Sequence, residues 1–175
     1  MTPIVNAHNE LYAMAKEGLV KAGLQKNLDK FIAESNRIEG INRPPTKGEI
    51  AATEHFLGMS DITVTDVKWL VKEYQPDARL RDLPGLDVQV GGYVAPRGGP
   101  DIETQLKDIL ARANRYRTIQ KKHEPHAVHT MYELLHPFTD GNGRSGRTLW
   151  LWMMRGHAPL GFLHTFYYQT LSAAR

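Results

Sequence analysis

The chain has 175 residues, no cysteine, and 22 lysines and arginines against 19 aspartates and glutamates, which gives a net charge of +3. This length fits a single domain over residues 1–175, the absence of cysteine excludes a disulfide scaffold, and so small a charge gives no argument for a nucleic-acid partner. We find neither the order of a signal peptide nor the roughly 18 apolar residues of a membrane span, so we expect a cytoplasmic protein without a membrane partner.

Most of the chain has helical periodicity or helix caps, and prolines fall between the helical segments. The sequence therefore predicts an all-α fold. The expected helices cover residues 8–23, 27–39, 46–58, 61–74, 101–115, 124–136, 143–155 and 163–173.

The helix expected over residues 27–39 has one apolar face, and a carboxylate lies at the end of that face. Glu39 falls only about 20° around the helix axis from Leu28, and Gly40 should end the helix. We expect Glu39 to point towards the core, where burial and the helix dipole both demand a cationic partner, preferably arginine. A frayed helix end that exposes Glu39 is the alternative. The face consists of Leu28, Phe31, Ile32, Ser35 and Ile38.

Residues 86–95 are the exception to the helical pattern. Apolar and polar residues alternate there up to Gly91 and Gly92, as in a short β-hairpin. Because an isolated hairpin is only marginally stable, we expect this one to lie on the helical body. These residues alone support equally well the hypothesis of an ordinary surface hairpin and that of a hairpin with a function.

The run from residue 136 to residue 147, HPFTDGNGRSGR, is the most informative part of the sequence. The glycines at 141 and 143 allow the backbone N–H groups to form an anion-binding nest, and the following helix adds its positive dipole end. Arg144 and Arg147 lie one turn apart at that same end, where cations are unfavourable by roughly 0.3–1 kcal/mol each unless an anion compensates them. The pattern therefore predicts an anionic guest.

Two further residues of this run suit polyphosphate chemistry. Asp140 comes directly before the nest, where a Mg²⁺ shared between one carboxylate and several phosphate oxygens would need it. His136 should end the preceding helix because Pro137 follows it. An imidazole with an ordinary pKa of about 6.5 is mostly neutral near pH 7 and can accept a proton from a hydroxyl. We therefore expect His136 to be a general base.

The run resembles the Fic motif, H-x-F-x-[D/E]-G-N-G-R-x-x-R, at every position. The resemblance implies a Fic-type helical domain with a small β-hairpin flap, and a Mg²⁺-dependent protein adenylyltransferase that moves AMP from ATP to a Ser, Thr or Tyr hydroxyl of a target protein. It implies that His136 is the base, that Asp140 binds Mg²⁺, and that Phe138 anchors the loop. The residues it assigns to ATP and its phosphates are Gly141, Asn142, Gly143, Arg144 and Arg147.

Two upstream segments resemble further parts of Fic proteins. Residues 86–96 resemble the flap, whose edge pairs with the backbone of the target; we expect the Val90 N–H to lie on that edge. Residues 35–40, SNRIEG, within a helix of about 27–40, resemble the inhibitory motif [S/T]-x-x-x-E-[G/N] through Ser35, Glu39 and Gly40. Its glutamate would pair with Arg147 and keep ATP from its reactive pose. The expected docking residues of the flap are Val88, Gln89, Val90, Gly91, Gly92 and Tyr93.

Several alternatives stay open at this point. The same fold could remove AMP from a modified protein or transfer another nucleotide or phosphate-bearing group, although Gly143 argues against the phosphorylating members, which have lysine there. A nucleotide-responsive binding module without transfer is a second alternative, but it would need neither His136 nor Asp140. Tyr167 and Tyr168 could contact adenine, or could pack in the core or in a homo-oligomer contact.

Overall fold

The computed structural model describes residues 24–119 and 124–154. The predicted all-α fold with a small β-hairpin is confirmed. The predicted helices 8–23 and 163–173, together with Tyr167 and Tyr168, lie outside the described residues. The elements are α2 (Leu24–Ile38), α3 (Lys47–Gly58), α4 (Val64–Tyr74), β1 (Gln89–Val90), β2 (Tyr93–Val94), α5 (Pro100–Ile119), α6 (Glu124–Leu135) and α7 (Asn142–Met153).

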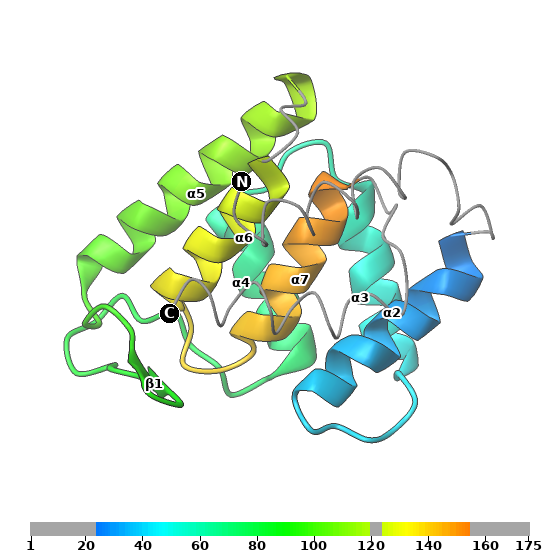
Figure 1. Cartoon of the computed structure of the whole chain (residues 1–175), viewed down its shortest axis with the longest axis horizontal. Helices are drawn as coiled ribbons and strands as arrows, with labels where there is room; N and C mark the ends of the chain where they lie inside the picture. Colours follow the sequence, from blue (N-terminus) through cyan, green and yellow to red (C-terminus); the bar gives the residue numbers. More distant parts are fainter. Residues whose placement is uncertain (1–23, 120–123, 155–175) are drawn as a thin grey trace, which may run out of the picture.

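Helix α7 is the centre of the fold. It contacts α2, α3, α4, α5 and α6, and in Figure 1 it lies in orange between α6 on one side and α3 with α2 on the other. Nearly every residue of α7 is buried, in agreement with the strongly apolar pattern of its second half. The N-terminus of α7 is therefore fixed in space by neighbours on several sides.

The core has two parts. The larger cluster joins α3, α4, α5, α6 and α7 around side chains such as Phe56, Leu106 and Trp152. A smaller cluster joins the apolar face of α2 to the C-terminal half of α7, and its buried residues are Leu28, Phe31, Ile32, Trp150, Leu151 and Met154. Helix α2 thus packs on α7 through a cluster of its own.

The ends of several helices differ from the sequence prediction, by three residues or more at the start of α2, the start of α4 and the end of α5. Residues 61–63 lie outside α4, because the Thr63 side chain caps its N-terminus in a capping box with Asp66. Helix α5 continues past residue 115 to Ile119. At the other end of the fold, Gly40 ends α2 as predicted, with φ at 76°.

The turn after α2 is a Schellman motif. The Ile41 N–H donates to the Asn36 carbonyl at 2.9 Å, and the Gly40 N–H donates to the Arg37 carbonyl at 3.0 Å. Glu39 is the first residue beyond the helix, and its position is set by this turn rather than by the apolar face.

The predicted hairpin is present near the lower end of α5 and α6 (Figure 1). Gln89 pairs with Val94 and Val90 pairs with Tyr93 in antiparallel register, and Gly91 takes the left-handed conformation, with φ at 59°. Across residues 24–119 and 124–154, no helix is long and apolar enough to cross a membrane.

Candidate functional site

The loop between α6 and α7 holds the predicted base in a rare backbone conformation. His136 follows the last residue of α6, and its φ of 49° lies in the left-handed region, which residues other than glycine seldom adopt. The His136 N–H donates to the Tyr132 carbonyl at 2.9 Å, and the side chain is half-buried. Such a conformation persists only where the surroundings determine it.

Phe138 anchors the loop, and Asn142 fixes it there. The Phe138 ring is buried in the main core. The Asn142 side chain accepts from the Phe138 N–H at 2.8 Å and donates to the Phe138 carbonyl at 2.7 Å. The buried Asn142 side chain thus holds both backbone groups of Phe138 and fixes the loop at the start of α7.

The N-terminus of α7 is built as predicted for an anion site. Gly141 caps the helix with φ at 78°, and no side chain caps it, so the first backbone N–H groups point outwards with the positive end of the dipole. Asp140 is exposed beside them, and its Oδ1 accepts from the Gly141 N–H at 2.6 Å. Asp140 is thus an accessible carboxylate beside the N-terminus of α7, and carboxylate oxygens are ligands that Mg²⁺ prefers.

Arg147 points back towards α2. Its Nε donates to Ser35 Oγ at 2.8 Å, and its Nη2 donates to the Ser35 carbonyl at 3.0 Å and to Glu39 Oε1 at 2.6 Å. The structure therefore places together the glutamate and the arginine that the sequence analysis expected to pair. The expectation that Glu39 points into the core was wrong: its side chain is 38% exposed against 1% for Arg147, because the Schellman turn carries Glu39 past the apolar face of α2.

The Glu39 carboxylate lies directly on Gly143. A Cβ built on Gly143 would overlap Glu39 Oε1 and would lie 3.0 Å from Arg147 Nη1. The carboxylate therefore fills the space that the missing side chain leaves, beside the first turn of α7. The carboxylate thus lies close to the place where the sequence pattern predicts an anionic guest.

Arg144 faces a second carboxylate, which the sequence analysis did not single out. The guanidinium is buried, donates to Gln75 Oε1 at 3.0 Å, and lies 5.5 Å from the centre of the Tyr74 ring. Its Nη1 is 3.8 Å from Glu49 Oε1. Both motif arginines thus have a carboxylate within ion-pair distance.

Glu49 is buried among donors at the start of α3. Burial raises its pKa, but hydrogen bonds from Arg43 and the Thr46 N–H outweigh burial and lower the pKa to about 2. Asn36 of α2 donates to the same carboxylate at 3.3 Å. The T-x-x-E spacing of a capping box was the available signal for Glu49, but nothing in the sequence pointed from it to Arg144.

The flap is tied to the end of α6. The Tyr93 hydroxyl donates to the Leu134 carbonyl at 2.8 Å, and the Ala95 N–H donates to the Val88 carbonyl at 3.3 Å. Hydrogen-bonded pairs alternate along an antiparallel ladder, so Val90 and Tyr93 also bond each other, while Gln89 turns its backbone groups outwards. The expected edge donor, the Val90 N–H, is wrong, and the outward N–H of β1 belongs to Gln89.

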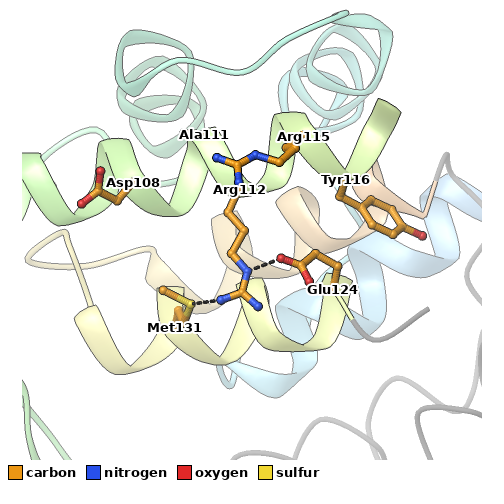
Figure 2. Close-up of a pocket in the computed structure, with 7 residues that line it drawn as sticks. All are labelled: Asp108, Ala111, Arg112, Arg115, Tyr116, Glu124 and Met131. Carbon is orange, nitrogen blue, oxygen red and sulfur yellow. Dashed lines mark hydrogen bonds and ion pairs between the residues drawn. The ribbon is translucent and has the colours of Figure 1, made fainter. Parts of the chain in front are cut away.

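Two hollows lie apart from these residues. One has a volume of about 530 Å³. Figure 2 shows that Arg112 of α5 extends across it towards Glu124 and Met131; Arg112 bonds Glu124, and its Nη1 lies 3.3 Å from Met131 Sδ. Another of about 610 Å³ lies between α2 and the segment that leads to α3. Neither is lined by a predicted site residue. The first is lined by Asp108, Ala111, Arg112, Arg115, Tyr116, Glu124 and Met131.

A comparison with protein-family models gives a match to the Fic/DOC family over residues 53–154. This stretch is more than half of the chain and contains the flap and the whole run from His136 to Arg147. It begins within α3, so Ser35 and Glu39 lie outside it.

Proposed function

Because this chain belongs to the Fic/DOC family and is a Fic-type enzyme, we propose that it is a protein adenylyltransferase that is inhibited by its own helix α2. The observation that carries the proposal is the first turn of α7. The first backbone N–H groups of α7, its dipole and Arg147 lie together there, and the Glu39 carboxylate accepts from Arg147 Nη2 at 2.6 Å beside Gly143. A triphosphate is the ligand that matches this arrangement.

His136 is the base of the proposed reaction. As the oxygen of a target Ser, Thr or Tyr forms a bond to the α-phosphorus of ATP, the hydroxyl proton passes to the His136 imidazole, and the bond from the α-phosphorus to the leaving pyrophosphate breaks. Asp140 is the residue that would hold Mg²⁺, which would neutralise charge on the phosphates. The N–H groups at the start of α7 hold the phosphates in line.

Inhibition follows from competition for one guanidinium. Arg147 gives Nη2 to Glu39 and to the Ser35 carbonyl and gives Nε to Ser35 Oγ, so the same donors cannot also hold the outer phosphate of ATP. The exposed side of Glu39 makes this contact replaceable. Removing the carboxylate would free Arg147 without opening the core.

The test compares label from the α-phosphate with label from the γ-phosphate of ATP, using the full chain and a cell lysate as the source of targets. Glu39→Gly should raise incorporation of α-label by roughly 5–150-fold, the range of a 1–3 kcal/mol coupling, and γ-label should not be incorporated. Glu39→Gln should also activate, since it removes the charge. Glu73→Gln, at an exposed position of α4, is the control and should change nothing.

Two further variants assign the roles. His136→Ala in the Glu39→Gly chain should abolish transfer while ATP still binds, and Arg147→Ala in the same chain should remove most of the activation. Incorporation of γ-label alone would overturn the proposed chemistry. Equal rates in Glu39→Gly and the parent chain would reject inhibition by α2.

A further inference from the structure

Arg81 is a buried cation whose guanidinium is bound by main-chain oxygens. The residue is 0% exposed. Its Nε donates to the His136 carbonyl at 2.6 Å, and its Nη2 donates to the Leu135 carbonyl at 2.7 Å. Both acceptors belong to the C-terminal end of α6, where carbonyls lack helical partners and a cation is favoured by the dipole. Arg81 thus caps the helix that leads into the catalytic loop.

The third nitrogen of Arg81 holds the two ends of the flap. Nη1 donates to the Pro96 carbonyl at 2.7 Å and to the Leu86 carbonyl at 3.2 Å. Leu86 comes before β1 and Pro96 comes after β2, so one nitrogen closes the base of the hairpin. The planar guanidinium of Arg81 therefore bonds both ends of the flap through Nη1 and the end of α6, at Leu135 and His136, through Nη2 and Nε.

The main chain around Arg81 reinforces this link. Its N–H donates to the Pro137 carbonyl at 2.9 Å, the Thr139 N–H donates to the Arg79 carbonyl at 2.9 Å, and Leu80 forms a β-bridge with Phe138. Residues 79–81 thus run beside the catalytic loop as a short antiparallel strand. Both backbone polar groups of His136 are therefore bonded, its carbonyl by Arg81 and its N–H by the Tyr132 carbonyl, and these bonds hold its unusual φ.

We propose that Arg81 is a positioning residue that fixes the flap and His136 at one separation, so that a hydroxyl on a target strand docked along the flap meets the imidazole. The inference rests on the proposed function and adds a residue to it. Arginine is needed because its rigid fork reaches carbonyls in three directions, whereas a lysine ammonium on a flexible stem cannot hold them in one geometry. Arg81 itself touches neither nucleotide nor target.

The first test is kinetic and uses the activated Glu39→Gly chain. Arg81→Lys should lower kcat for transfer to a protein target by about 10–100-fold, the effect of a misplacement of about 1 Å, while Kd for ATP stays within about twofold. Arg115→Lys is the matched control, because Arg115 is an exposed arginine on α5 and has no contact with the flap or the loop among the interactions described above, and it should change neither quantity. Equal losses of kcat and ATP binding in Arg81→Lys would mean a general structural role and would overturn the proposal.

The second test needs no activity and therefore separates this inference from the proposed function. Amide hydrogen exchange should rise together in residues 86–96 and 136–139 of Arg81→Lys, while α3 and α4 stay protected. If Glu39→Gly transferred no AMP, the proposed function would fail, yet this exchange pattern would still support the link between flap and loop. A rise in only one of the two segments would overturn the link.

If Arg81→Lys does not fold, Tyr93→Phe decides the question. That variant removes one donor between the flap and the Leu134 carbonyl and leaves Arg81 in place. Exchange in both segments should then rise by a smaller amount than a lost Arg81 would cause. Unchanged exchange in residues 136–139 would show that the flap and the loop are held independently.

Discussion

Two arginines flank the catalytic loop, and they are held by different chemistry. Arg81 contacts the C-terminal end of α6, just before the loop, and its side chain donates to four backbone carbonyls. A substitution at the acceptor residues leaves those carbonyls in place. Arg147, on α7 after the loop, is bound to Ser35 and to a carboxylate that is 38% exposed. The first contact is built into the fold, and the second can be exchanged for another anion.

The difference divides the site into two halves. We call Arg81, the flap and the loop that begins at His136 the permanent half, and we call Arg147 with its partners on α2, Ser35 and Glu39, the releasable half. The match to the Fic/DOC family covers Arg81, the flap and the loop but not Ser35 or Glu39. Helix α2 also has its own small hydrophobic cluster on α7, so its attachment can weaken without opening the main core. In the proposed function, the flap and the loop would therefore keep their geometry while access to Arg147 changes.

The largest effect expected on the releasable half comes from a methyl group on Gly143. Gly143→Ala should cost about 1–2 kcal/mol in the free energy of unfolding, because its Cβ must push the flexible Glu39 carboxylate off Arg147. The cost arises although alanine is the better helix former. In Glu39→Gly the same change should cost at least about 1 kcal/mol less, since only Arg147 Nη1 remains near the new Cβ.

The measurement is urea unfolding of the four chains that make up this double-mutant cycle. Gly58→Ala is a suitable control, because a Cβ there meets nothing within 4 Å, and it should not destabilise either parent. Identical costs of Gly143→Ala in both parents would mean that the carboxylate does not press on the first turn of α7 in solution.

A smaller effect is expected on the permanent half when the outward edge of the flap is blocked. Gln89→Pro removes the outward N–H of β1, and a backbone hydrogen bond contributes about 0.5–1.5 kcal/mol. Modification of a protein target should therefore fall by roughly two- to tenfold, with ATP binding unchanged, whether or not Glu39 is present. Measured rates with the target in excess and at low concentration separate docking from chemistry.

Gln89→Ala is the matched control for that variant. It keeps the backbone N–H and removes the bond from the Gln89 side chain to the Gly91 carbonyl, at 2.9 Å. Modification at the parent rate is expected. An equal loss in Gln89→Ala and Gln89→Pro would assign the effect to the side chain and not to the edge.

The sequence predicted the parts of this site that have local signatures. The hairpin, the glycine that ends α2 and the run from His136 to Arg147 all follow from spacing over a few residues. The partner of Glu39 was predicted correctly, but the predicted burial of its side chain was wrong, because the direction of a side chain beyond a helix end depends on the turn that follows. Arg81 was missed because its acceptors are carbonyls up to 55 residues away. Every residue has a backbone carbonyl, so no residue type in the sequence identifies the partners of Arg81.

The smallest effect expected is acid sensitivity of the releasable half alone. Glu49 bonds Asn36 of α2 and faces Arg144, and its pKa is lowered from 4.5 to about 2. A lowered pKa means that the folded chain binds this proton less readily than the unfolded chain. The stabilisation is therefore complete above pH 4.5 and is lost as the pH falls towards 2.

Between pH 7 and pH 4, the loss from this carboxylate should be less than about 1 kcal/mol. It is measured as the difference between the parent chain and Glu49→Gln in urea unfolding at each pH. Glu103→Gln is the control, because the Glu103 carboxylate pairs with Lys107 on the surface of α5, where such pairs contribute little. The flap should not share this pH dependence. The acceptors of Arg81 are carbonyls, which do not titrate in this range, so amide exchange in residues 86–96 should not follow the protonation of Glu49.

If the flap loosened with the same pH midpoint as α2, the two halves would unfold as one cooperative unit, and the distinction between a fixed and a releasable arginine would be lost.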